Sequence, residues 1–262
     1  MTISGRIENV VTKLTVGVIG GMGPAATVDF LARIIAATPA ERDQDHLHVL
    51  VDCNPEVPDR TAFLRSEGPD PRPILMAMAK RLEQAGADLL VMPCNTAHAF
   101  ADDIRMAVAI PLVDWASVVA DAVALAGLDR VGILASTGTL FADLYRVPLE
   151  ARGIRPVVPT PSGQVEVMRA IYGTEGVKRL GPDSPVARRD LLAGVQDVVG
   201  QGAAGVILAC TEFSAISRVQ SLEVKVPVLD ASEIVARHVV GRALGLPVAA
   251  GGRVTGKPAN AA

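Results

Sequence analysis

The sequence predicts an α/β protein of two pseudo-symmetric lobes, each a parallel sheet flanked by helices, with the functional site in the cleft between them. Short β-branched runs alternate with longer segments of helical period, which is the pattern of parallel strands covered by helices. A sequence motif is also repeated: residues 86–96 recur as residues 202–212, which places Cys94 and Cys210 at an offset of 116 residues. Such a repeat indicates a duplication that produced two half-sites facing each other.

The expected strands and helices alternate through both halves of the chain. The first half predicts strands at 15–19, 48–52 and 89–92, and helices at 24–37, 71–84 and 96–108. The second half predicts strands at 131–134, 156–158 and 206–208, and helices around 163–172, 186–200 and 211–220. Further helices at 115–126 and 231–244 each follow an aspartate, Asp114 or Asp230, whose side-chain oxygen makes a good N-cap. Residues 249–262 are rich in Gly, Ala and Pro without periodicity, and we expect them to be disordered.

The composition excludes several classes of function. The 262 residues are 50% hydrophobic, carry a net charge of -3 and are only 3% aromatic, so nucleic acid is not an expected partner. No apolar run reaches the ~20 residues that span a bilayer, so no contact with a membrane is expected. The first residues do not have the pattern of a secretory signal, which predicts a cytoplasmic protein. An odd set of cysteines without a C-x-x-C pair, Cys53, Cys94 and Cys210, predicts free thiols.

Cys94 and Cys210 are the strongest candidates for chemistry. Each follows an apolar strand, and the binding crevice of an open α/β sheet lies beyond the carboxyl ends of its strands. A helix is expected after each cysteine, and a helix N-terminus favours a thiolate over a thiol, from an ordinary pKa near ~8.5. Two such groups across a cleft can remove a proton from one face of a carbon and deliver one to the other. The alternative is that each cysteine is only a small buried hydrophobic residue. This alternative explains a single cysteine better than two cysteines in the same repeated motif. We interpret Cys53 as structural or as lining the site, and not as catalytic.

Two other motifs leave alternatives open. The spacing Gly21-x-Gly23-x-x-Ala26 after a strand, with Asp52 ending the next strand, matches a dinucleotide-binding turn. However, Asp52 lies farther from the glycines than the typical ~20 residues. A turn of this kind also offers backbone amides to any anion. His98, four residues after Cys94, is compatible with a zinc site, but the second half has no equivalent histidine.

A carboxylate substrate would also need positive charge. Arg60 and Lys178 lie in loop-like stretches and are candidates for this role, because cations bind carboxylates and stabilise a neighbouring carbanion. Their spacing alone does not separate them from ordinary solvated surface charges.

Distinctive motifs are spread along the chain. They are Ile19-Gly20-Gly21-Met22-Gly23-Pro24, Pro58-Asp59-Arg60-Thr61, Asp70-Pro71-Arg72-Pro73, Met92-Pro93-Cys94-Asn95-Thr96-Ala97-His98, Val167-Met168-Arg169 with Ile171-Tyr172-Gly173, and Ala209-Cys210-Thr211-Glu212. Together they resemble the motifs of the aspartate racemases in the cofactor-independent aspartate/glutamate racemase family. The resemblance runs from about residue 15 to residue 244.

The resemblance implies an active site between the lobes with neither pyridoxal phosphate nor metal. Cys94 and Cys210 match the catalytic thiols, and Arg60 and Lys178 match residues for substrate recognition and electrostatics. The remaining predicted substrate-binding residues are Met22, Asn95, Thr96, Ala97, Thr137, Thr211 and Glu212. Glu212 also fits a first-turn carboxylate favoured by the helix dipole. The predicted N-terminal lobe comprises residues 1–114 with a returning helix at about 231–248, and residues 115–230 form the other lobe. A homodimer is expected.

These inferences predict an enzyme that interconverts L- and D-aspartate by a two-base mechanism. A racemase of broader range is the nearest alternative, because glutamate differs from aspartate by one methylene, worth only about 1 to 3 kcal/mol. A nicotinamide-dependent oxidoreductase and a non-catalytic binder of small dicarboxylates are further alternatives.

Overall fold

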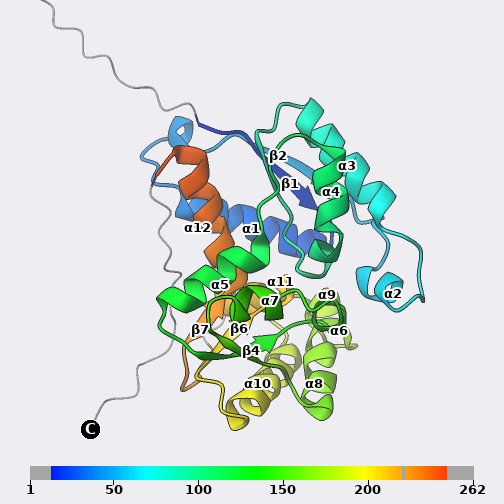
Figure 1. Ribbon diagram of the computed structural model, residues 1–262, viewed down its shortest axis with the longest axis vertical. Coiled ribbons are helices and arrows are strands. Elements are labelled where there is room, and N and C mark those ends of the chain that lie inside the picture. The colour runs from blue at the N-terminus through cyan, green and yellow to red at the C-terminus, as the bar shows by residue number, and fades with distance from the viewer. Residues whose placement is uncertain (1–12, 220–221, 247–262) are drawn as a thin grey trace, which may run out of the picture.

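Two separate parallel sheets form the framework of the protein. The computed structural model describes residues 13–219 and 222–246, so the predicted disordered tail at 249–262 lies outside the described residues. The first sheet has the order β2 (Val49–Cys53), β1 (Val16–Gly20), β3 (Leu89–Val91). The second has the order β5 (Arg155–Val157), β4 (Arg130–Leu134), β6 (Gly205–Leu208), β7 (Val228–Asp230). Figure 1 shows the two sheets in separate layers with helices around each, which confirms the predicted fold class.

The duplication seen in the sequence is also present in the strand order. β1 lies between β2 and β3, and its counterpart β4 lies between β5 and β6, with all pairs parallel. β7 adds a fourth strand beside β6. The corresponding segment of the first half makes only an isolated bridge, Leu90 to Leu112. The two lobes therefore share one topology, and the edge strand is reduced in the first.

The long helices lie close to the predicted ranges. They are α1 (Pro24–Ala37), α3 (Arg72–Gln84), α4 (Ala101–Ala107), α5 (Trp115–Leu125), α8 (Pro161–Tyr172), α10 (Pro185–Gly200), α11 (Thr211–Val219) and α12 (Ala231–Leu244). Asp114 accepts from the backbone N–H of Ser117, and Asp230 from those of Ser232 and Glu233, which confirms both N-caps. In the described part of the chain, no helix is long and apolar enough to cross a membrane.

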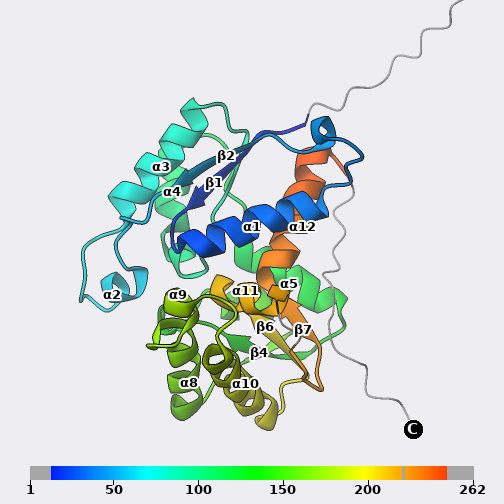
Figure 2. The ribbon, with the colours of Figure 1, turned by 180° about the vertical axis from the view of Figure 1, so that it is seen from behind.

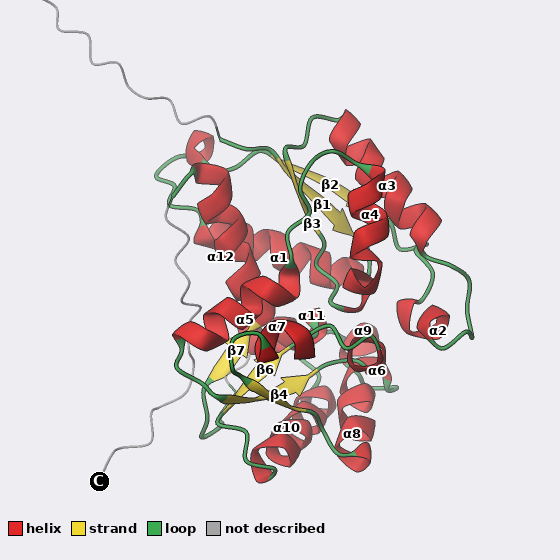
Figure 3. Cartoon of the chain, in the orientation of Figure 1, coloured by secondary structure: helices red, strands yellow, loops and turns green. Residues whose placement is uncertain are grey.

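The sequence did not predict several short helices as separate elements (Figure 3). They are α2 (Arg60–Leu64), α6 (Thr137–Phe141), α7 (Arg146–Glu150), α9 (Val177–Leu180) and the 3-10 turns η1 (Asp43–Asp45) and η2 (Thr96–Phe100). Each has at most five residues, too few for a helical period to show in the sequence. The predicted helix at 96–108 is divided into η2 and α4 at Phe100, whose ring lies 5.7 Å from that of Phe63.

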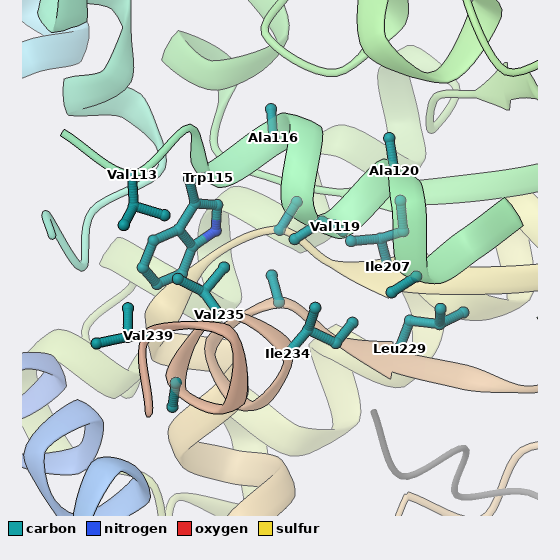
Figure 4. Packing of buried hydrophobic residues seen from close by; sticks show 14 of the residues in the cluster. Val113, Trp115, Ala116, Val119, Ala120, Ile207, Leu229, Ile234, Val235 and Val239 are labelled. Atoms are coloured by element: carbon teal, nitrogen blue, oxygen red, sulfur yellow. The ribbon is translucent and has the colours of Figure 1, made fainter. Parts of the chain in front are cut away.

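The two sheets are joined through a shared hydrophobic core. α12 packs against α1 and α5, as Figure 2 shows from behind. Trp115, at the start of α5, is fully buried beside Val235 and Val239 of α12 (Figure 4). Its ring centroid lies 5.5 Å from that of Phe30 on α1. α12 thus returns to α1 of the first half, while the predicted lobe boundaries at 114 and 230 stay a prediction.

Trp115→Ala is expected to lower the free energy of unfolding by about 3–5 kcal/mol, because it removes the largest side chain of this core and leaves a cavity. Urea denaturation followed by circular dichroism measures the change. Leu125→Ala is the matched control, because Leu125 ends the same helix and is 65% exposed. A Trp115→Ala variant no less stable than Leu125→Ala would contradict the role given to this core.

Candidate active site

A small cavity lies where four strands of the two sheets end. Met22 follows β1, Cys94 follows β3, Ser136 follows β4 and Cys210 follows β6. The carboxyl ends of both sheets therefore face one space, as expected for ligand sites in open α/β sheets. The cavity is lined by Met22, Arg60, Cys94, Asn95, Thr96, Ser136, Thr139, Tyr172, Lys178, Ala209, Cys210, Thr211 and Glu212.

Most of the residues predicted from the sequence meet at this cavity. Both cysteines line it, together with Met22, Arg60, Asn95, Thr96, Lys178, Thr211 and Glu212. Two predicted residues are not part of its wall. Ala97 is fully buried in η2. The Thr137 hydroxyl accepts from Gln164 Nε2 of α8 at 3.2 Å, because α6 turns this side chain towards α8.

Ser136, Thr139 and Tyr172 also line the cavity, although they were not among the predicted substrate-binding residues. The hydroxyls of Ser136 and Thr139 hydrogen-bond to that of Thr96, at 2.8 and 2.9 Å, so they link the second sheet to the first. The only signal for them was the hydroxyl-rich stretch after β4, and the sequence does not say which hydroxyls point inward. The Tyr172 ring lies 5.5 Å from Lys178 Nζ, a cation–π contact at the edge of the cavity.

Arg60 places a positive charge beside Cys94. Its Nη1 donates to the carbonyls of Val57 and Pro58, at 3.1 and 3.0 Å, and its Nε has no partner in the described residues. No ion pair between Arg60 and a carboxylate is present in the described ranges, although the side chain is buried. A buried guanidinium without a carboxylate partner is costly unless an anion completes its environment. Arg60 is thus suited to hold an anionic substrate near Cys94.

Cys210 has the opposite electrostatic environment. Its thiol donates to Glu212 Oε2 at 3.0 Å, and Glu212 Oε1 pairs with Lys178 Nζ at 2.6 Å. Burial, and then the Glu212 carboxylate, raise the pKa of Cys210 well above its ordinary value. Burial opposes the charge on Glu212, but Lys178 and the thiol outweigh it and lower the pKa of Glu212. Cys210 is therefore a protonated thiol beside an ionised carboxylate.

The expectation that a helix N-terminus favours the thiolate at both cysteines is wrong for Cys210. Cys210 does precede α11, but the Glu212 side chain from the first turn of that helix lies against its sulfur. A full negative charge in hydrogen-bond contact outweighs the partial positive charge of the helix end. Cys94 is followed by the short 3-10 turn η2, so the helix that was expected to act on it is absent at that point.

The structure gives the other motif residues different partners. His98 Nε2 donates to the carbonyl of Met92 at 3.0 Å, and burial lowers the pKa of His98 to about 4. Within residues 13–219 and 222–246, no group of at least three His, Cys, Asp or Glu could hold a metal ion. Asp52 pairs with Arg81 at 2.7 Å, so its carboxylate is already engaged. Cys53 is exposed at the end of β2 and does not line the cavity.

The cavity is closed around a very small space. Its volume of about 20 Å³ is close to the ~10–15 Å³ that one water needs. α2 packs against α6 across the two halves. A Cβ on Gly138 would lie 2.4 Å from Thr61 Oγ1 and 2.8 Å from Thr96 Cγ2, so the glycine permits this close approach. The space is smaller than an amino acid, so binding of such a molecule requires the groups that line the cavity to move.

Comparisons with known proteins agree with this fold and arrangement. A family model described as Asp/Glu/hydantoin racemase matches residues 19–239. An aspartate racemase structure from Picrophilus torridus superposes with a TM-score of 0.74 and 28% identity, covering 90% of this chain and 96% of that one. A broad specificity amino-acid racemase of Bacillus subtilis is 24% identical, over 86% of this chain and 96% of that protein. A glutamate racemase of Pseudomonas entomophila is 31% identical, over 63% of this chain and 61% of that protein. The chain therefore belongs to the Asp/Glu/hydantoin racemase family.

Proposed function

We propose that this protein is a cofactor-independent racemase of acidic amino acids, with aspartate as its preferred substrate. One observation carries the proposal: thiols from equivalent positions of two duplicated halves line one cavity, and the charges beside them differ in sign. Racemisation needs a base on one face of the α-carbon and an acid on the other. Among the relatives named above, the Picrophilus protein is an aspartate racemase, which favours aspartate.

In the proposed mechanism the reacting pair consists of a Cys94 thiolate, which acts as the base, and a Cys210 thiol, which acts as the acid. Arg60 lies beside the first sulfur, and Glu212 holds the proton on the second. The Cys94 thiolate removes the α-proton, the C–H electron pair remains on the substrate, and the Cys210 thiol delivers its proton to the opposite face. Cys94 ends as the thiol and Cys210 as the thiolate. The other enantiomer reacts by the same steps in reverse.

Positioned acid–base groups contribute only about 10²- to 10⁴-fold in rate, so the carbanion also needs electrostatic stabilisation. Arg60 supplies a buried cation without a carboxylate partner. Lys178 supplies a second cation, which pairs with Glu212 and whose side chain is 24% exposed. Although burial opposes the charge of Lys178, Glu212 more than offsets it and raises the pKa of Lys178. Both cations thus keep their charge while the substrate carboxylates bind.

Chiral chromatography of L-aspartate and L-glutamate incubated with dialysed protein under reducing conditions tests the proposal. We expect D-aspartate to form at a rate proportional to enzyme concentration, without added cofactor, and faster than D-glutamate forms. A Cys94→Ala, Cys210→Ala double variant is the control for background racemisation. Faster turnover of glutamate would show that glutamate, and not aspartate, is the preferred substrate. If neither L-aspartate nor L-glutamate gave its D-enantiomer, the proposed activity would be refuted.

Glu212→Gln is expected to make Cys210 reactive at lower pH, because it removes the carboxylate that, after burial, raises the pKa of this thiol. Alkylation of Cys210 by iodoacetamide, followed by mass spectrometry, should be about tenfold faster at neutral pH in the variant, since only the thiolate reacts.

Glu56→Gln, which removes an exposed carboxylate outside the cavity, is the matched control. An alkylation profile of Cys210 that is the same in Glu212→Gln and in the control would show that the carboxylate does not hold the proton on this thiol.

A further inference from the structure

Tyr145 reaches from the second half of the chain to a residue beside Cys94. It lies at the N-cap position of α7 and is 3% exposed. Its hydroxyl donates to Asn95 Oδ1. Asn95 follows Cys94, lines the cavity and is 5% exposed. Tyr145 itself is not part of the cavity wall.

The other end of the Asn95 amide has no partner. Asn95 Nδ2 is buried and makes no hydrogen bond with any described residue. Buried N–H donors without partners are rare in folded proteins, and one in the wall of a cavity is suited to a ligand acceptor. Asn95 occupies the N-cap position of η2, but its side chain makes no capping hydrogen bond there. Its own segment therefore does not fix the orientation of this amide.

The phenol can fix that orientation because it remains a donor. Burial raises the pKa of Tyr145 far above its ordinary value, so the hydroxyl keeps its proton throughout the physiological range. Its proton draws the carbonyl oxygen of Asn95 towards Tyr145. The amide is planar, so Nδ2 then lies on the side away from the phenol.

We propose that Tyr145 is a positioning residue, which orients Asn95 so that Nδ2 donates to a carboxylate oxygen of the bound substrate. This inference rests on the proposed racemase function and adds a residue that does not touch the substrate. Tyr145 and Asn95 are 50 residues apart in the chain, in different halves, so the contact also requires the two halves to be together.

A double-mutant cycle tests this role. Tyr145→Phe removes only the hydroxyl and is expected to lower kcat/KM for L-aspartate by about 3- to 10-fold, mainly through a higher KM. In an Asn95→Ala background the same change should have no further effect, because no amide remains to be oriented. A merely structural role would lower kcat/KM by the same factor in both backgrounds, and that result would overturn the proposal.

A control variant separates orientation from lost stability. Thr38→Val removes another buried hydroxyl, which donates to the Ile34 carbonyl at 2.7 Å and lies outside the cavity. It should leave KM unchanged. A rise in KM as large as that of Tyr145→Phe would overturn the proposal.

Nuclear magnetic resonance gives a readout that does not depend on turnover. With ¹⁵N-labelled asparagine, the side-chain amide of Asn95 is identified by its loss in Asn95→Ala. Its signals should shift in Tyr145→Phe and stay in place in Thr38→Val. Unmoved signals in Tyr145→Phe would overturn the positioning role even if the enzyme racemises aspartate. Shifted signals in a protein without racemase activity would support the orientation of Asn95 and refute the proposed function.

Discussion

Cys94→Ala and Cys210→Ala are each expected to reduce racemisation of L-aspartate by about 10³- to 10⁴-fold, in both directions of reaction. Each thiol acts as base for one enantiomer and as acid for the other, so the loss of either removes one half of every turnover. Circular dichroism at the aspartate absorption band follows the approach to the racemic mixture from L- and from D-aspartate.

Cys53→Ala is the matched control, because Cys53 also lies at the end of a strand but is exposed and does not line the cavity. It should retain the turnover of the unchanged protein. A Cys94→Ala or Cys210→Ala variant with the turnover of Cys53→Ala would show that the reaction does not need both thiols.

Arg60→Met is expected to lower kcat/KM for aspartate by about 10²- to 10³-fold, since charge-assisted hydrogen bonds contribute about 1.5–3 kcal/mol each and more than one is lost. Methionine keeps much of the length of arginine and leaves a neutral side chain in a buried site. Steady-state kinetics with L-aspartate measures the change, and circular dichroism checks that the variant is folded.

Arg65→Met is the control for this experiment. Arg65 is the C-cap of the same short helix, α2, but its side chain is 53% exposed and pairs with Glu67. We expect its kcat/KM to be near that of the unchanged protein. If Arg60→Met bound aspartate as well as Arg65→Met does, the buried guanidinium would have no part in substrate binding.

The sequence was informative where a feature depends on local pattern or on repetition. Strands and long helices follow from periodicity, and the caps at Asp114 and Asp230 follow from the hydrogen bonds that aspartate makes at helix starts. The repeated sequence motif placed Cys94 and Cys210 in equivalent positions, and the structure brings them to one cavity.

The contacts that distinguish the two halves of the site were not predictable in this way. The raised pKa of Cys210 depends on burial and on the side-chain direction of Glu212, which a position in a first helical turn does not fix. Tyr145 meets Asn95 only through the packing of two halves, and the short α7 that carries it has too few residues to show a period. The family resemblance implied Thr137, whereas Ser136 lines the cavity, because a stretch of hydroxyl residues does not reveal which of them point inward.

The two-base mechanism is tested most directly by the fate of deuterium early in the reaction. L-aspartate is incubated with the enzyme in D₂O, and both enantiomers are separated and analysed by mass spectrometry before the reverse reaction contributes. Because one thiol removes the α-proton and the other, exchanged with solvent, delivers a deuteron, the D-aspartate should carry deuterium while the remaining L-aspartate keeps its protium. Protium retained in D-aspartate, or deuterium in the recovered L-aspartate at this stage, would contradict two separate bases.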